Sequence, residues 1–334
     1  MDILIKSFNR PYYLERCIQS IYTNVLDHTF SITVLDDGTP EKYLQKLQLK
    51  FPEIKLVTSE FYKEKSERIA REGASASIQI PIAMWLTAAK NATDYFVLLE
   101  DDIWFTQKIN LQETERILKQ EKASFLKLFW LNNPKLIHGT TLKVLENLQF
   151  YKPKVFTKNP LLYRLIFGIT RYGNRKLMRF LSLYSKEKAL HYYSMYGVAG
   201  AIFHKDYFLS LWDKHTNVVD ENLQLKNAVK YWHNHPHIQF ARTNQEYVAT
   251  GFLSSATNKG FNPENFDVFQ FNKSINEAWF NDKLDIMNNF PNDLNTDEIE
   301  TILAKENNPH ATVKDWKLWT TSFKKQFQNI GCNI

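Results

Sequence analysis

The sequence has 334 residues, 44% of them hydrophobic and 23% charged, which is enough to bury a core for one large domain or two ordinary ones. Its two cysteines offer neither a disulfide framework nor metal-ligand spacing, no apolar run approaches the roughly 18 residues of a membrane-spanning helix, and no secretory leader precedes the first strand-like run, so we expect a cytoplasmic protein. The net charge of +6 indicates an anionic partner, which could be nucleic acid, a phosphate-bearing small molecule or a membrane surface.

The first hundred residues alternate strand and helix signals. Strands are predicted at 2–8, 31–37, 54–58 and 95–99. Between them, helices are predicted after Pro11, over EKYLQKLQL at 41–49, and between Ser75 and Ala92. This β-α-β-α-β-α-β order predicts an α/β fold, with a mostly parallel central sheet flanked by helices on both faces.

Acidic residues follow two of these strands. The second strand ends in LDD at 35–37, and the fourth ends in EDD at 100–102. Ligands of open α/β sheets bind outside the carboxyl ends of the strands, so we expect these acids to line one crevice. Adjacent carboxylates repel each other unless a cation lies between them, and oxygen ligands suit Mg²⁺ or Mn²⁺. The alternative is that they are solvated turn and helix-capping residues.

The order of these motifs resembles a known family. IKSFNRPYYLERCIQSIY, then ITVLDDGT, and later DYFVLLEDD are similar to the N-terminal half of GT-A-fold glycosyltransferases, particularly the inverting family 2-like enzymes that use nucleotide-diphosphate sugars. VAGAIFHKDYF at 198–208 is similar to the family's acceptor-side glycine-alanine segment. VVDENLQLKN at 218–227 is similar to its acidic motif followed by a leucine-x-leucine-basic helix. The resemblance covers about residues 3–105 and 196–228, and the four motifs keep the family's order.

The resemblance implies a donor site. Phe8 would lie near the nucleobase, Asp37 would hydrogen-bond the base's ring N–H, and Gly200 would belong to the nucleotide-sugar site. Asp102 would bind Mn²⁺ or Mg²⁺, with Asp101 as a second metal contact close to the donor ribose or sugar. A metal held by Asp102 and both phosphates would neutralise the leaving nucleoside diphosphate as a Lewis acid.

The basic stretch KEKSERIAR at 63–71 precedes the fourth strand. A contact with a phosphate or with the base is plausible there, and Arg71 is the candidate for it. The alternative is a solvated, charged loop.

An inverting transfer also needs a carboxylate to remove the proton of the acceptor hydroxyl. Asp220 aligns with the family's base when Leu223, Leu225 and Lys226 are laid on the leucine-x-leucine-basic pattern, and Glu221 is the neighbouring alternative. Read without the family, Asp220 and Glu221 form an acidic helix start, which the helix dipole favours.

The sequence departs from the family at its late metal-binding histidine. The comparable segment, EYVATGFLSS, has Ala249 and Thr250 at that place. A nearby cluster, WHNHPH, offers His233, His235 and His237 at alternate positions, which would share one face of a strand and could supply a ligand. A solvated edge explains the same histidines equally well.

Residues 150–195 have no counterpart in the resemblance. Within them, 161–190 mixes aliphatic and aromatic residues with Arg and Lys, which fits a peripheral membrane contact, a helical lid over the crevice, or a part of the core. Near the C-terminus, DWKLWTTSFKKQF predicts a helix. The predicted organisation is a catalytic domain at 1–250, made of a nucleotide-sugar-binding half (1–105), an inserted helical segment or lid (150–195) and an acceptor half (196–250), followed by a C-terminal extension at 251–334.

From the sequence we therefore expect a metal-assisted, inverting glycosyltransferase of the hexosyltransferase class that uses a nucleotide sugar, most plausibly a UDP-sugar. The acceptor would be a glycan or lipid-linked glycan, as in polysaccharide biosynthesis, in the cytoplasm or peripherally at the inner face of the membrane. Three alternatives stay open: a catalytically inactive nucleotide-sugar-binding protein, a nucleotidyltransferase and a nucleic-acid-binding protein. Because Lys and aromatic residues are spread along the chain without a binding signature, we predict no nucleic-acid partner.

Overall fold

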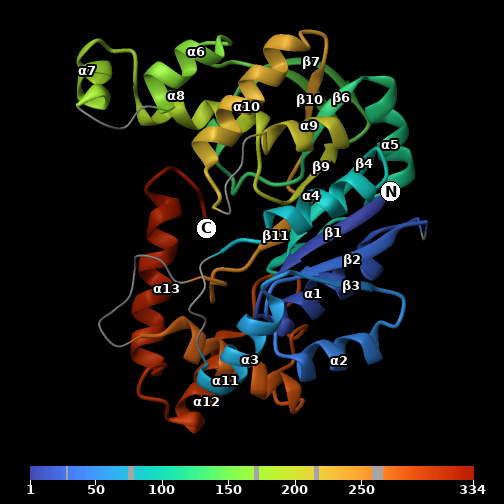
Figure 1. Ribbon diagram of the computed structural model, residues 1–334, viewed down its shortest axis with the longest axis vertical. Helices are drawn as coiled ribbons and strands as arrows, with labels where there is room; N and C mark the ends of the chain where they lie inside the picture. Colours follow the sequence, from blue (N-terminus) through green and yellow to red (C-terminus); the bar gives the residue numbers. More distant parts are fainter. Residues whose placement is uncertain (28, 74–78, 169–172, 214–217, 258–265) are drawn as a thin grey trace.

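The computed structural model of the protein describes residues 1–27, 29–73, 79–168, 173–213, 218–257 and 266–334. In these residues a nine-stranded sheet runs in the order β3-β2-β1-β4-β9-β6-β10-β8-β7 (Figure 1). Its strands are β1 (Asp2–Ser7), β2 (Ser31–Asp36), β3 (Lys55–Thr58), β4 (Tyr95–Glu100), β6 (Ala123–Lys127), β7 (Gly139–Leu145), β8 (Leu148–Pro153), β9 (Ala201–His204) and β10 (Gln239–Thr243). A separate antiparallel pair joins β5 (Ile103–Phe105) to β11 (Val248–Thr250).

The sheet has a parallel half and a mixed half. Strands β3, β2, β1 and β4 are parallel, as the sequence predicts. Beyond them β9 runs antiparallel between β4 and β6, β10 is parallel to β6, and β8 and β7 add two antiparallel strands. The α/β class with helices on both faces is confirmed, and parallel pairing is concentrated in the first hundred residues.

Two hydrophobic cores lie on opposite faces of the sheet. On β1, Ile3 and Ile5 point into one core while Leu4 points into the other, the alternation expected of a strand buried on both sides. The first core is covered by α1 (Pro11–Asn24), α2 (Glu41–Lys50), α5 (Leu111–Gln120), α11 (Val268–Phe280), α12 (Thr296–Glu306) and α13 (Val313–Gln328). The second core is covered by α4 (Ile82–Asn91), α9 (Lys205–Leu211) and α10 (Glu221–Asn234).

The N-terminal helices form where the sequence predicts them. Helix α1 begins at Pro11, whose missing N–H costs nothing in the first turn, and its apolar stripe, including Cys17, is fully buried. Between β3 and β4 the chain forms two helices rather than one. The basic stretch 63–71 lies in α3 (Tyr62–Glu72), so its interpretation as a loop is wrong.

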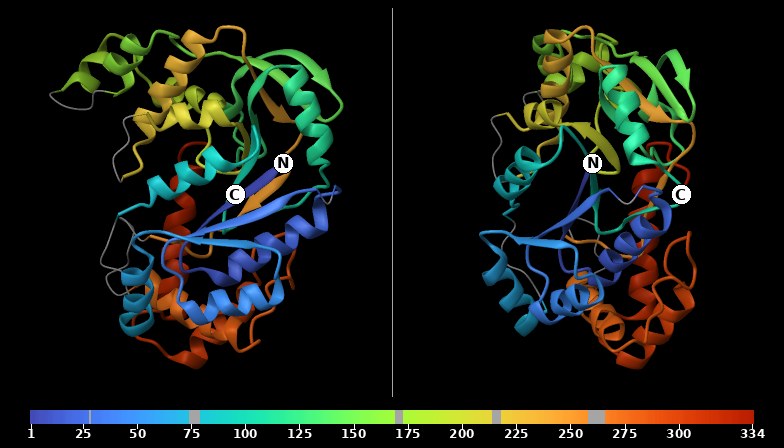
Figure 2. Two further views of the ribbon diagram at one scale, coloured as in Figure 1. Left: turned by 45° about the vertical axis from the view of Figure 1, so that its right-hand side comes forward. Right: turned by 90° about the vertical axis from the view of Figure 1, so that its right-hand side faces the viewer.

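The C-terminal stretch packs beneath the N-terminal half (Figure 2). The guanidinium of Arg16 on α1 donates to the backbone carbonyls of Ile286 and Asn292. The hydroxyl of Tyr12 donates to Oδ1 of Asn272 at 2.9 Å. These buried bonds tie residues 266–334 to α1, and α13 confirms the helix predicted over DWKLWTTSFKKQF.

The segment that has no counterpart in the resemblance is built from short helices at one end of the molecule, with α7 outermost (Figure 1). They are α6 (Pro160–Tyr163), η2 (Arg164–Gly168), α7 (Asn174–Phe180), α8 (Lys186–Leu190) and η3 (His191–Met195); η1 (Pro134–Ile137) packs against η3. Tyr163, Phe167 and Tyr192 join them to the second core. Among the residues described, we find no helix long and apolar enough to span a bilayer.

Candidate functional site

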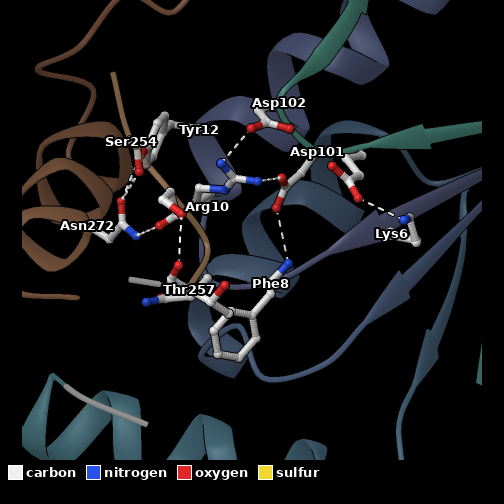
Figure 3. Close-up of polar contacts among 12 residues, drawn as sticks. Lys6, Phe8, Arg10, Tyr12, Asp101, Asp102, Ser254, Thr257 and Asn272 are labelled. Atoms are coloured by element: carbon white, nitrogen blue, oxygen red, sulfur yellow. Dashed lines mark hydrogen bonds and ion pairs between the residues drawn. The ribbon is translucent and has the colours of Figure 1, made fainter. Parts of the chain in front are cut away.

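The structure brings the two acidic strand ends together. Strand β1 lies between β2 and β4, and all three are parallel. The backbone N–H of Asp37 donates to the carbonyl of Ser7 at 3.1 Å, and that of Asp101 donates to the carbonyl of Lys6 at 2.9 Å. The acids of LDD and EDD therefore lie on either side of the end of β1. Figure 3 shows Asp101 and Asp102 next to Arg10, which precedes α1.

Arg10, which the sequence analysis did not single out, holds both aspartates of EDD. It occupies the N-cap position of α1 without a side-chain cap hydrogen bond, and its side chain is 5% exposed. Nη1 donates to Oδ2 of Asp102 at 2.7 Å, and Nη2 donates to Oδ1 of Asp101. The other oxygen of Asp101 accepts from the N–H of Phe8 at 3.1 Å. Each oxygen of Asp101 thus accepts one hydrogen bond within the chain, and its use as a second metal contact stays a prediction.

Glu100 and Asp37 also have cations of the chain beside them, whereas Asp36 accepts hydrogen bonds from Gly38 and Thr39. Nζ of Lys6 donates to Glu100 at 2.7 Å, and Nζ of Lys65 donates to Asp37 at 2.5 Å. Lys6 and Lys65 are both buried. We expected a bound cation to relieve the repulsion between the acids. In the structure, Lys6 of β1, Arg10 just before α1 and Lys65 of α3 already lie beside these acids.

Burial sets the protonation of this cluster. It raises the pKa of Asp101 to about 7, although Arg10 acts in the opposite direction, and it raises the pKa of Asp102 as well. Burial also opposes the charge of Arg10, but the two aspartates outweigh it and raise the guanidinium pKa. The cluster therefore holds a permanently charged cation beside a carboxyl group that can take up a proton near neutral pH.

One oxygen of the cluster is left over. Within the described part of the chain, Oδ1 of Asp102 is buried and has no hydrogen-bond partner. Buried polar atoms are nearly always paired, so an unpaired carboxylate oxygen beside a strand end marks a place where a ligand can act. Mg²⁺ commonly takes one or two carboxylates and completes its shell with water and phosphate oxygens, and a single free oxygen suits that mode.

Within the described part of the chain, the hydrogen bonds of Asp102 involve no imidazole. The backbone N–H of Gly251 donates to the carbonyl of Asp102 at 2.9 Å, and Thr250 on β11 is opposite Ile103 on β5. The segment where the family's late histidine would be expected thus lies next to Asp102, and it carries Ala249 and Thr250 instead. Among the described residues, no three His, Cys, Asp or Glu side chains come together as a metal-binding group.

The prediction that WHNHPH places three histidines on one strand face is wrong. His233 lies in the last turn of α10, and His235 follows that helix as its C-terminal cap. Leu225, Ala228 and Val229 are buried at helical spacing, and this apolar face holds the segment as a helix up to Asn234. The alternation of histidines is therefore not a strand signal.

Phe8 and Asp37 lie together with Lys65 around Gly38, and we call these four residues the Phe8 cluster. A Cβ at Gly38 would be 3.0 Å from the Phe8 ring and 2.7 Å from Cβ of Lys65, so only glycine allows this approach. The two oxygens of Asp37 accept from Lys65 and from Ser59, the latter at 2.5 Å. The cluster thus joins a half-buried ring to a carboxylate, the pair that the resemblance assigns to a nucleobase.

Arg71 does not join this site. Its side chain is 72% exposed and pairs with the neighbouring Glu72. The cation that α3 directs inward is Lys65, six residues earlier, which the same basic stretch contains. The charge run predicted a cation at the site, but the choice of Arg71 within it was wrong, because packing sets the inward face of α3.

Close packing and backbone conformation explain why residue 200 is a glycine. Its φ of +64° is unfavourable for other residues, and a Cβ there would lie 2.3 Å from the ring of Phe129. Its N–H donates to the carbonyl of Leu98 at 2.8 Å, and its carbonyl accepts from the N–H of Leu128 at 3.1 Å. Gly200 therefore lets β9 enter the sheet between β4 and β6.

On the acceptor side, Asp220 and Glu221 begin α10. Oδ1 of Asp220 accepts from the N–H of Leu223 at 3.1 Å, which is an ordinary helix cap. Glu221 accepts from the hydroxyl of Tyr193. The pKa of the Tyr196 hydroxyl is raised chiefly by burial, and the negative charges of Glu221 and of Glu100 raise it further. Tyr196 is thus within electrostatic reach of both the α10 start and the end of β4.

No protein-family profile and no curated protein sequence match this chain. Among solved structures, S. aureus TarS 1–349 in complex with UDP-GlcNAc is similar with a TM-score of 0.42 and 13% identity, covering 98% of this chain and 81% of that one. The galactosyltransferase LgtC in complex with donor and acceptor sugar analogs gives 0.34 and 11%, covering 69% and 70%. The bifunctional glycosyltransferase WbbM gives 0.32 and 12%, covering 69% and 37%. At these values none of the three assigns an activity to this chain.

Proposed function

We propose that this chain is a glycosyltransferase that transfers a sugar from a UDP-sugar to a glycan or lipid-linked glycan acceptor with inversion. The observation that carries the proposal is the meeting of LDD, EDD and Phe8 at the end of β1. Four sequence motifs in the order of an inverting glycosyltransferase family give it its reaction type.

In the proposed donor complex the Phe8 cluster binds the base. The ring of Phe8 packs against it, and Asp37 accepts from its ring N–H. An ionised carboxylate has about four acceptor positions, so Asp37 can take this bond in addition to those from Ser59 and Lys65. Nζ of Lys65 lies 5.6 Å from the Phe8 ring centroid and places a positive charge beside the proposed base-binding ring.

The diphosphate is proposed to lie beside Asp102. Oδ1 of Asp102 would hold a Mn²⁺ or Mg²⁺ that arrives with the donor, and that metal would stabilise the negative charge of the leaving diphosphate. Arg10 fixes the orientation of the Asp102 carboxylate through the opposite oxygen. Asp101 acts as a positioning residue, because it links Arg10 to the backbone N–H of Phe8.

The decisive experiment is a calorimetric titration of UDP, with GDP as the control nucleotide, with and without Mn²⁺. Wild type should bind UDP, and Mn²⁺ should tighten binding at least about tenfold, which is 1.4 kcal/mol. Asp102→Asn should lose the gain from Mn²⁺, since the amide has no charge for the metal. Asp282→Asn, at an exposed aspartate paired with Lys46, is the matched control. If neither nucleotide binds wild type in any condition, the proposal fails.

The proposed base is Asp220, which also caps α10. One substitution can separate these two roles. Asn caps helices as well as Asp does, so Asp220→Asn should keep the start of α10 while removing the base. We expect kcat to fall by about 10² to 10⁴ with no change in UDP affinity or thermal stability. Glu221→Gln, which keeps an acceptor for Tyr193, is the parallel variant. Loss of turnover in Glu221→Gln alone would transfer the role to Glu221.

A second candidate function is nucleotide-sugar binding without turnover. It is favoured by the engagement of Arg10 with both aspartates of EDD and by Ala249 and Thr250 in place of a histidine. It predicts UDP binding that is indifferent to Mn²⁺ and unchanged in Asp102→Asn. In that case no sugar would be released from any UDP-sugar, with or without an acceptor.

A further inference from the structure

One end of the molecule is rich in cations and free of acids in its sequence. No Asp or Glu occurs between Glu146 and Glu187. The nine Lys and Arg of this stretch are Lys152, Lys154, Lys158, Arg164, Arg171, Arg175, Lys176, Arg179 and Lys186. The rest of the chain contains more acids than cations, so the net charge of +6 originates in these forty residues.

The same segment exposes large apolar side chains. On α7 and its cap, Leu177, Phe180 and Leu181 follow the i, i+3, i+4 spacing of one helical face, and Phe180 is 86% exposed. On α6 and η2, Leu161 and Leu165 are one helical turn apart, and Leu161 is 73% exposed. Several such residues gathered on neighbouring short helices differ from the single exposed apolar residues of an ordinary surface.

These apolar residues project from ordered structure. Met178 of α7 is buried, and the guanidinium groups of Arg175 and Arg179 lie 5.3 Å and 5.5 Å from the ring centroid of Tyr184. The stacked arginines therefore fix α7 with Phe180 outward. Figures 1 and 2 show α7 as the outermost helix at this end of the molecule.

We propose that α6, η2 and α7 dock on the surface of an anionic lipid bilayer, with Leu161, Leu177 and Phe180 inserted among the acyl chains. Insertion removes exposed apolar area from water, and the flanking cations bind the headgroups. Nucleic acid would satisfy the cations but would leave the aliphatic side chains in water. Only a surface that combines anionic groups with an apolar interior matches both features.

Docking at a bilayer would bring the protein to the place where a lipid-linked acceptor is held, which extends the proposed function. Helix α8 and η3 connect the docking helices to Tyr193, whose hydroxyl contacts Glu221 beside the proposed base. A lipid-linked glycan held in the bilayer would thus reach the α10 side of the site. The identity of the acceptor rests on the proposed function, whereas the docking itself does not.

The test is flotation of the full chain with vesicles of phosphatidylcholine, with and without phosphatidylglycerol. Wild type should float with the anionic vesicles and not with the neutral ones. Raising the salt concentration should weaken binding, because headgroup attraction is screened. No donor or acceptor is present, so the outcome is independent of whether the chain transfers sugar.

Two variants separate the two contributions. Arg164→Glu/Lys176→Glu, at two exposed cations of η2 and α7, should weaken binding at least about 25-fold, because each cation near the bilayer surface contributes about fivefold. Phe180→Ser should weaken it about tenfold, even at low salt, through loss of buried apolar area.

Two control variants lie outside the docking helices. Lys55→Glu/Lys90→Glu changes the net charge equally, and Leu49→Ser lies on α2, where Leu49 is also 86% exposed.

Each outcome decides the proposal. Loss of flotation in both docking variants, with both controls unchanged, supports it. Absence of flotation by wild type overturns it, and so does equal weakening by the controls, which would reveal non-specific charge attraction. Binding to RNA without binding to vesicles would also overturn it, in favour of a nucleic-acid surface. None of these results affects the UDP titration, so the two proposals stand or fall separately.

Discussion

The strand-end cluster and the segment of α6 to α8 use the same cationic residue types in opposite ways. At the strand ends Lys6, Arg10 and Lys65 are buried, and each donates to an acid of the chain. In the segment, cations such as Lys176 and Arg179 are exposed, and the sequence from 147 to 186 around them contains no acid. Buried charges must be paired inside the protein, whereas exposed charges can be left for a partner. The first group thus builds the site, and the second group is available for recognition.

The largest effect should come from breaking the buried pairing. Arg10→Ala would leave Asp101 and Asp102 side by side without their cation, and the free energy of unfolding should fall by about 3–5 kcal/mol. Chemical denaturation measures this. Arg116→Ala, which breaks an exposed pair with Glu113, should cost less than about 1 kcal/mol. Equal losses in the two variants would show that burial does not distinguish these pairs.

The next largest effect concerns two glycines, one packed in the sheet and one at the start of α7. Gly200→Ala introduces a Cβ against Phe129 at a φ of +64°, so both overpacking and backbone strain apply, and we expect a loss of about 2–4 kcal/mol. Gly173→Ala precedes α7 at a φ of +72°, and no atom of the described residues lies within 4 Å of the added Cβ, so strain alone should cost about 1 kcal/mol. Thermal unfolding compares them. A milder effect at Gly200 than at Gly173 would contradict its packing role.

A smaller effect concerns pH. The pKa of Asp101 is raised to about 7 in the folded protein, above its unfolded value, so its protonated form stabilises the fold. This contribution is fully present below the unfolded pKa and is lost as the pH rises to about 7. The stability of wild type relative to Asp101→Asn should therefore decrease between pH 4 and pH 7. A relative stability that increases with pH would mean that Arg10 keeps Asp101 ionised throughout.

The smallest effect should be found at the tip of the segment. Phe180→Ser removes a side chain that already faces water, so the free energy of unfolding should change by less than about 0.5 kcal/mol. Denaturation of this variant beside wild type measures the change. A loss of several kcal/mol would show that Phe180 packs within the protein, and its exposure would then not be available for a membrane.

The sequence predicted the first parallel strands well and the histidines poorly, for one physical reason. Runs such as YFVLL, and the apolar stripe of α1, are long and end in clear turn residues, so local pattern decides their structure. WHNHPH is short and polar, and the buried face of α10 that precedes it extends the helix to Asn234. The helix over 63–71 was missed for a similar reason. Few residues of α3 are apolar, so the stretch shows no apolar helical stripe.

Within the candidate site, Asp37, Asp101 and Asp102 could be found because they follow strands whose carboxyl ends must meet at one edge of the sheet. Arg10 could not be assigned in the same way. Its partners are 91 and 92 residues away along the chain, and no local spacing relates them. The choice of Lys65 over Arg71 was likewise beyond the sequence, because both belong to one charged helix and only its packing turns Lys65 inward.

By itself the sequence determined the alternation of elements, the acids at the strand ends and the acid-free stretch between Glu146 and Glu187, since these depend on residue order and near neighbours alone. Only the tertiary structure decided which cation faces which acid, which histidines lie on a helix and which apolar residues stay exposed. Those outcomes depend on contacts between distant parts of the chain, where burial requires every charge to find a partner and leaves unpaired groups at the surface.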